Sequence, residues 1–281
     1  MVQTESQGQV PAFVQEVIDD LLPLIQQVEL GRYAVGMSGS LTKRVWDERS
    51  DIDLRLYHEQ PMEQPGPEDP RWLPYFARIA WWAERGVTID GLWARTIDEV
   101  DASVAAWLSG DHRPDPIVWS VWGYHPLPDL SQQLAVDDPY GIIAGWRAQL
   151  TTYPPILKER LLAHHLESLH YWRDDYHYAN KVVREDVVFL AGLSTRLVHD
   201  VIQVIFALNE TFFAGDGNNL RLIEGFAIAP DDAANRITAI LYPPTGIDGI
   251  EAQRAQIIAL IDDLDVLATD PSARSGHSRF A

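Results

Sequence analysis

The sequence of 281 residues has no cysteine, few basic residues and no long uninterrupted apolar run. The absence of cysteine excludes disulfides and thiolate chemistry. Only 22 basic residues stand against 41 acidic ones, and the formal net charge of −19 repels a polyphosphate backbone, which argues against nucleic acid as a main partner. No apolar run approaches the length of a membrane span, and the first residues lack the regions of a signal peptide. These absences predict a soluble, cytoplasmic protein with no membrane partner.

The residues that are abundant predict a protein with real hydrophobic cores. Hydrophobic residues make up 46% of the chain, which includes ten tryptophans. The acidic excess favours a cationic substrate or a bound metal ion, although a solubilising acidic surface is the alternative explanation. Charge alone does not decide between the two.

Two patterns of apolar residues divide the chain near residue 145. In residues 1–145, helical spacing predicts an opening helix, and short apolar runs between proline and glycine breaks predict strands at 33–37, 52–57 and 87–93. A further helix is expected from about Thr96. Residues 146–281 contain two long proline-free segments, 156–181 and 184–213, with apolar residues every three or four positions, and a third helix near 250–267. The expected fold is α+β, with a small mixed β-sheet and helices followed by an α-helical bundle.

Two aspartates, Asp51 and Asp53, stand one residue apart within an apolar run. Because side chains alternate along a strand, both carboxylates lie on one face while Ile52 and Leu54 lie on the other. Two adjacent carboxylates repel each other and raise each other's pKa, so the pair calls for a cation, and hard oxygen ligands suit Mg²⁺. This pattern predicts a magnesium site.

A Gly-Ser pair, Gly39 and Ser40, precedes the aspartates. A glycine allows the backbone to approach a triphosphate closely, and the serine offers hydroxyl and amide donors. Taken separately, Asp-x-Asp and Gly-Ser are common turn and loop sequences. Together they predict a site for a metal ion and a nucleotide triphosphate.

An apolar strand, Gly39-Ser40, ten intervening residues and then Asp51-Ile52-Asp53-Leu54 resemble the signature of the polymerase beta nucleotidyltransferase superfamily. The resemblance in motif covers residues 33–57. It implies a small mixed sheet with helices, and an aspartate pair that holds Mg²⁺ together with a third carboxylate on a neighbouring strand. The layout of 1–145 as a nucleotidyltransferase domain and 146–281 as a helical domain is similar to that of nucleotidyltransferases that modify aminoglycosides and lincosamides.

The resemblance directs attention to further residues. Asp90, in the apolar stretch GVTIDGLWARTI, is the candidate for the third metal ligand and for the general base, although it could instead be a turn residue before Gly91. Lys43 and Arg44 are candidates for contacts to the triphosphate, with surface charge as the alternative.

The helical half contains a cluster of histidines, acids and aromatic residues. His170, Asp174 and His177 share a helical face, but the established short zinc patterns are absent, and we do not assign a zinc site. Asp174 and Asp175, beside aromatic residues, are candidates for binding an amine-bearing acceptor. Glu185 is a candidate acceptor ligand or an alternative base to Asp90, although an acid there also suits the start of a helix.

The function expected from these features is Mg²⁺-dependent transfer of a nucleoside monophosphate, AMP from ATP, to a small acceptor such as an aminoglycoside-like antibiotic, with release of pyrophosphate. The alternative is a regulatory or antitoxin-like protein that keeps the nucleotidyltransferase fold and binds or modifies a protein partner. The residues themselves do not identify the acceptor.

Overall fold

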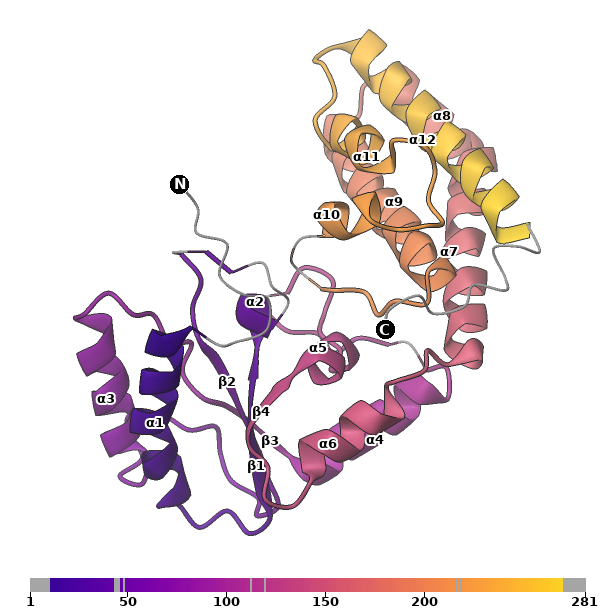
Figure 1. The fold of residues 1–281 in the computed structure, drawn as a ribbon. Helices are drawn as coiled ribbons and strands as arrows, with labels where there is room; N and C mark the ends of the chain where they lie inside the picture. The colour runs from indigo at the N-terminus through magenta and orange to yellow at the C-terminus, as the bar shows by residue number, and fades with distance from the viewer. Residues whose placement is uncertain are drawn as a thin grey trace. The chain divides into compact units, whose positions relative to one another are not determined.

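The computed structural model describes residues 11–42, 46–47, 49–111, 113–118, 120–215, 217 and 219–269. It has a mixed α+β fold in which many helices accompany one small four-stranded sheet (Figure 1). This part of the expected fold class is confirmed.

The chain divides into two compact units. The first, which we call the sheet unit, comprises the chain up to Val104 together with Pro126–Thr152. The second, the helical unit, comprises Ala105–His125 together with the chain from Tyr153 onward. The boundary that the sequence suggested after residue 145 falls inside a helix of the sheet unit, α6 (Ile142–Gln149).

The sheet has the strand order β3-β2-β1-β4. Its strands are β1 (Tyr33–Ser38), β2 (Asp53–His58), β3 (Trp93–Thr96) and β4 (Leu134–Asp137). The central strand β1 pairs antiparallel with both β2 and β4, while β2 and β3 are parallel. The antiparallel register places Ser38 opposite Asp53 and Gly36 opposite Arg55.

One face of the sheet is covered by α1 (Ala12–Gln26) and α3 (Leu73–Ala83), which lie side by side in Figure 1. Alternation along β2 turns Leu54 and Leu56 toward these helices, where they join a buried cluster with Val35, Trp72 and Tyr75. The opposite residues of β2 therefore face away from this core. On that other face, Tyr57 contacts Trp146 of α6, with ring centroids 4.7 Å apart.

The third predicted strand differs from the structure. The sequence placed it at 87–93, whereas β3 begins at Trp93, and only Ile89 of the earlier residues forms a bridge, with Ile52. The physical reason is Gly91, whose φ of 51° interrupts the extended backbone. β4 is a strand that the sequence reading missed.

The helix expected from about Thr96 is α4 (Ile97–Leu108). Thr96 and Glu99 form reciprocal side-chain-to-backbone hydrogen bonds at its start: Glu99 N donates to Thr96 Oγ1 at 3.2 Å, and Thr96 N donates to Glu99 Oε2 at 3.0 Å. This capping box explains why the helix begins there. Three short helices also belong to the sheet unit: α2 (Gly39–Thr42), α5 (Leu127–Gln132) and α6.

The helical unit contains α7 (Pro155–Asp174), α8 (Tyr176–Val183), α9 (Val187–Leu208), α10 (Asn219–Glu224), α11 (Ala233–Leu241) and α12 (Ile247–Thr269). The segment 156–181, which we predicted as one helix, is two. Asp175 has extended backbone angles and its side chain accepts a hydrogen bond from His177 N, so it ends α7 and caps α8. A side chain that competes for backbone donors favours such a break.

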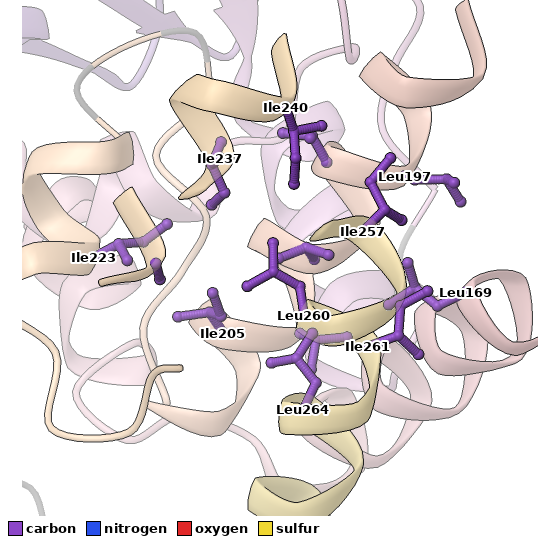
Figure 2. Packing of buried hydrophobic residues seen from close by; sticks show 14 of the residues in the cluster. Leu169, Leu197, Ile205, Ile223, Ile237, Ile240, Ile257, Leu260, Ile261 and Leu264 are labelled. Atoms are coloured by element: carbon purple, nitrogen blue, oxygen red, sulfur yellow. The ribbon is translucent and has the colours of Figure 1, made fainter. Parts of the chain in front are cut away.

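The core of the helical unit is built around α9 (Figure 2). Leu197 and Ile205 of α9 pack with Leu169 of α7 and with Ile257 and Leu260 of α12, all nearly inaccessible to solvent. In the described part of the chain, α9 is also the one helix that is long and apolar enough to cross a membrane, with a mean hydropathy of 1.4. However, 56% of its apolar stretch is buried, as in the core helix of a soluble protein.

Candidate functional site

Three carboxylates meet at one end of the sheet unit's β2. Ile52 N donates to Thr88 O at 3.0 Å, and Asp90 N donates to Ile52 O at 3.1 Å, which locks the two segments in parallel register. Ile52 and Ile89 are the bridged pair and both are buried. The residues that flank this pair, Asp51, Asp53 and Asp90, are therefore turned away from the core to the same side of the sheet.

The three carboxylates lie close enough to share one cation. Oxygen atoms of Asp51, Asp53 and Asp90 all lie within 4.8 Å of one another. Asp51 and Asp53 are half-buried, whereas Asp90 is exposed. Carboxylate oxygens at this spacing are the ligand type that Mg²⁺ prefers. Among the described residues, no other group of histidines and acids has this geometry.

The clustering of the three carboxylates disfavours the charged form of Asp53. Burial raises the pKa of its carboxyl, and the neighbouring charges of Asp51 and Asp90 raise it further. Arg55 opposes these effects, because its Nη2 lies 3.2 Å from Asp53 Oδ1. The side chains of both partners are only 13% and 11% exposed. A bound cation would remove much of the remaining repulsion.

The backbone of Gly39 lies directly against this carboxylate. A Cβ atom at Gly39 would overlap Asp53 Oδ2, and the φ of Gly39 is 76°, a region that side chains disfavour. Both the space and the backbone conformation therefore require glycine. The sequence suggested Gly39 because a glycine lets the backbone approach a phosphate closely. The structure adds a second reason, which is the contact with Asp53.

Ser40 follows Gly39 and has a polar atom that is not satisfied. Its Oγ is buried and has no hydrogen-bond partner among the residues that the structure describes. Buried hydroxyls are normally paired, so such an atom calls for an explanation. A ligand oxygen beside Gly39 would supply the acceptor. Lys43 and Arg44, the other candidate contacts to phosphate, lie outside the described residues.

Two features beside the carboxylates were missed by the sequence reading. Arg55 follows Asp53 by two residues and so shares its face, and its guanidinium also lies over the ring of Trp93, 5.2 Å from the centroid. Gln133 is fully buried, and its Nε2 donates to Ser38 Oγ and to Tyr57 OH, both at 2.9 Å. Strand alternation could have found Arg55. Nothing local in the sequence marks Gln133, because it comes from a segment 95 residues away.

The candidate acceptor residues lie in the helical unit and have partners of their own. Asp174 is paired with Arg173, whose Nε lies 2.9 Å from Asp174 Oδ1, and Asp175 caps α8. Glu185 is exposed and has a φ of 50° in the turn between α8 and α9. Trp172, one of the aromatic residues beside them, packs against the core. Asp174 and Asp175 thus have partners within the helical unit.

A comparison with protein families finds one match. Residues 130–215 are similar to a domain of unknown function, DUF4037. The match covers less than a third of the chain and includes Gln133 but none of the three clustered aspartates. No curated protein matches the chain.

Proposed function

We propose that the protein is a Mg²⁺-dependent nucleotidyltransferase that moves a nucleoside monophosphate, AMP from ATP, to a small-molecule acceptor. The observation that carries the proposal is the convergence of Asp51, Asp53 and Asp90, with ligand atoms within 4.8 Å, beside the backbone of Gly39. The proposal makes the sheet unit the nucleotidyltransferase domain and the helical unit, which also includes Ala105–His125, the accompanying helical domain. It rests on this geometry and on the resemblance of the Gly-Ser and Asp-x-Asp motif.

In this proposal, Asp51 and Asp53 hold the metal ion and Asp90 completes the set. When bound, the ion neutralises charge on the phosphates and on the departing pyrophosphate. Gly39 permits close approach of the triphosphate, and the unpaired Ser40 hydroxyl donates to a phosphate oxygen. Lys43 and Arg44 remain candidates for further phosphate contacts.

The transfer itself is a displacement at the α-phosphorus. The acceptor's hydroxyl oxygen or amine nitrogen forms the new bond to that phosphorus, the bond to the bridging oxygen breaks, and pyrophosphate leaves with the electron pair. The acceptor's proton passes to Asp90, which is exposed and can receive it, with Glu185 as the alternative base. Positioning and electrostatic stabilisation supply most of the rate.

The acceptor is proposed to be cationic, such as an aminoglycoside-like antibiotic. The net charge of −19 raises the local concentration of cations around the protein. Asp174, Asp175 and Glu185 are the candidate ligands for this acceptor. The donor and the metal can be tested without it.

The test is a screen of the purified protein with each nucleoside triphosphate, Mg²⁺ and a panel of antibiotics. We expect pyrophosphate release that stops with EDTA, and a product whose mass has grown by one nucleoside monophosphate. Asp53→Asn should be inactive, whereas Asp98→Asn, which removes an exposed acid from α4, should be fully active. Nucleotide binding that is unaffected by both Mg²⁺ and Asp53→Asn would contradict the proposed site.

A further inference from the structure

A groove of about 630 Å³ lies wholly within the helical unit. One wall is α7, and the other is formed by the last turns of α12 and the end of α9. None of its residues belongs to the carboxylate site of the sheet unit. Concave sites of this size are typical for small organic ligands.

The middle of the α7 wall is apolar. α7 presents Lys158, Leu162, Leu166 and His170 at intervals of four residues, which places them along one face of the helix. The two central leucines are half-buried and pack against the core of the unit. A ligand with an apolar body would bury this surface.

Small side chains leave the space between the walls open. Ala163 of α7 and Ala268 of α12 both line the groove. Longer side chains at these two positions would occupy the volume. The open volume of the groove therefore depends on the small side chains at these two positions.

The cationic side chains at both ends are already neutralised. Lys158 Nζ lies 2.9 Å from Glu210 Oε1 and also donates to Leu208 O at 3.5 Å. At the other end, Asp265 accepts from Arg173 Nη1 at 2.8 Å and lies 2.6 Å from His170 Nε2. Neither end offers an unpaired positive charge to an anionic ligand.

Glu159 gives the groove its remaining charge. It is exposed on the rim and forms no ion pair with any residue that the structure describes. The acids that line the groove are Glu159, Glu210 and Asp265, against the single lysine Lys158. A cationic group on a ligand would be attracted there, in addition to the attraction from the protein's overall charge.

We propose that this groove binds an amphipathic molecule with an apolar body and one protonated amine. The body lies on Leu162 and Leu166, between the two alanines, and the ammonium group lies at Glu159. The proposal is independent of the nucleotidyltransferase assignment, since the two sites share no residue. A nucleotide or an anionic lipid is not expected there, because the local charge is negative.

The test uses three probes with the same apolar body: octylammonium, octanol and octanoate, each titrated into the full-length protein by calorimetry. Octylammonium should bind at least about threefold more tightly than octanol, as expected for a charge pair at a partly exposed rim. Octanoate should bind most weakly. Equal affinities, or a reversed order, would overturn the chemistry proposed for the ligand.

Two matched pairs of variants locate the site. Ala163→Trp should weaken octylammonium binding by more than about tenfold (about 1.4 kcal/mol), because the indole would fill the groove. Ala191→Trp, at an exposed alanine of α9 outside the groove, should leave binding unchanged. Glu159→Gln should weaken binding by about two- to fivefold, whereas Glu167→Gln, at an exposed glutamate of α7 outside the groove, should not.

Glu159→Gln is a surface change and should not affect folding, so it keeps the test valid if Ala163→Trp unfolds the unit. No binding of any probe, or equal losses within either matched pair, would refute the groove as the site. Nucleotide affinity and pyrophosphate release should be unchanged in Glu159→Gln, which separates this result from any failure of the proposed function.

Discussion

An acid in the helical unit and an acid in the sheet unit have opposite electrostatic surroundings. In the helical unit, Asp200 is 5% exposed, and its carboxylate accepts hydrogen bonds from His165 Nδ1 at 2.7 Å and from Ser168 Oγ at 2.8 Å. In the sheet unit, Asp53 is crowded by two other carboxylates and has a single arginine to offset them.

The contrast is between a carboxylate whose charge is offset by hydrogen-bond donors and one whose charge is only partly offset. A carboxylate with donors on both oxygens stabilises its surroundings, because its desolvation is offset locally. Carboxylates that face one another raise the energy of the folded chain unless a cation binds between them. Of the 41 acidic residues in the sequence, Asp51, Asp53 and Asp90 form the candidate metal site, and their crowded surroundings support that assignment.

The largest expected effect comes from variants that remove one of the clustered carboxylates. Asp51→Asn or Asp53→Asn should lower nucleotide transfer by more than about a hundredfold, because each removes a charged ligand of the proposed metal ion. The melting temperature of Asp51→Asn should not fall, since this change removes like-charge repulsion and leaves the ion pair between Asp53 and Arg55 intact. Turnover by pyrophosphate release and melting by circular dichroism measure the two quantities. A folded double variant with normal turnover would eliminate the metal assignment.

The next effect concerns the backbone beside that site. Gly39→Val should weaken nucleotide binding by at least about tenfold, because its side chain would collide with Asp53 in addition to straining the backbone. Gly86→Val is the matched control, since Gly86 has a similar φ of 79° but open space around its Cβ position. Calorimetry with a non-hydrolysable nucleotide measures both. If the two variants lost similar nucleotide affinity, the cause would be backbone strain and not the collision with Asp53.

The third prediction concerns Asp200, whose two carboxylate oxygens both accept hydrogen bonds. Asp200→Ala should lower the free energy of unfolding of the helical unit by about 2–4 kcal/mol, because it removes the acceptor of the hydrogen bonds from His165 and Ser168. Ser168→Ala should lower it less, since Asp200 keeps one donor. Urea denaturation measures the change. Turnover per folded molecule should stay normal, and a selective loss of turnover would contradict a purely structural role.

The smallest effect is a pH dependence in the helical unit. Burial lowers the pKa of His199 to about 4, and the nearby His165 lowers it too. Because the unfolded chain binds this proton more readily, the stabilisation from neutral His199 is complete above its unfolded pKa of 6.5 and is lost as the pH falls toward 4.

We expect His199 to account for a loss of about 2 kcal/mol between pH 7 and pH 5. His199→Phe keeps a ring to stack on Trp122, which lies 4.0 Å from the histidine ring, but it cannot be protonated. Its unfolding free energy should therefore change less with pH than that of the original protein. Equal pH slopes in urea titrations would contradict this account.

Much of the carboxylate site could be predicted from local sequence. Strand alternation places Asp51 and Asp53 on one face, and the family resemblance pointed to Asp90, in an apolar stretch, as the third carboxylate. Other parts could not be predicted locally. The break at Asp175 interrupts a run whose apolar spacing is helical on both sides, and β4 is short and largely exposed, so it carries no strong strand pattern.

The sequence by itself determined which residues carry charge, which positions of β2 share a face, and where glycine and serine precede the aspartates, because these depend on order and on local periodicity. Only the tertiary structure decided that Asp90 reaches the pair, that Gly39 lies against Asp53, and that Gln133 bridges Ser38 and Tyr57. These contacts join segments far apart in the chain, and their register is set by the packing of the sheet on its helices, which local sequence does not encode.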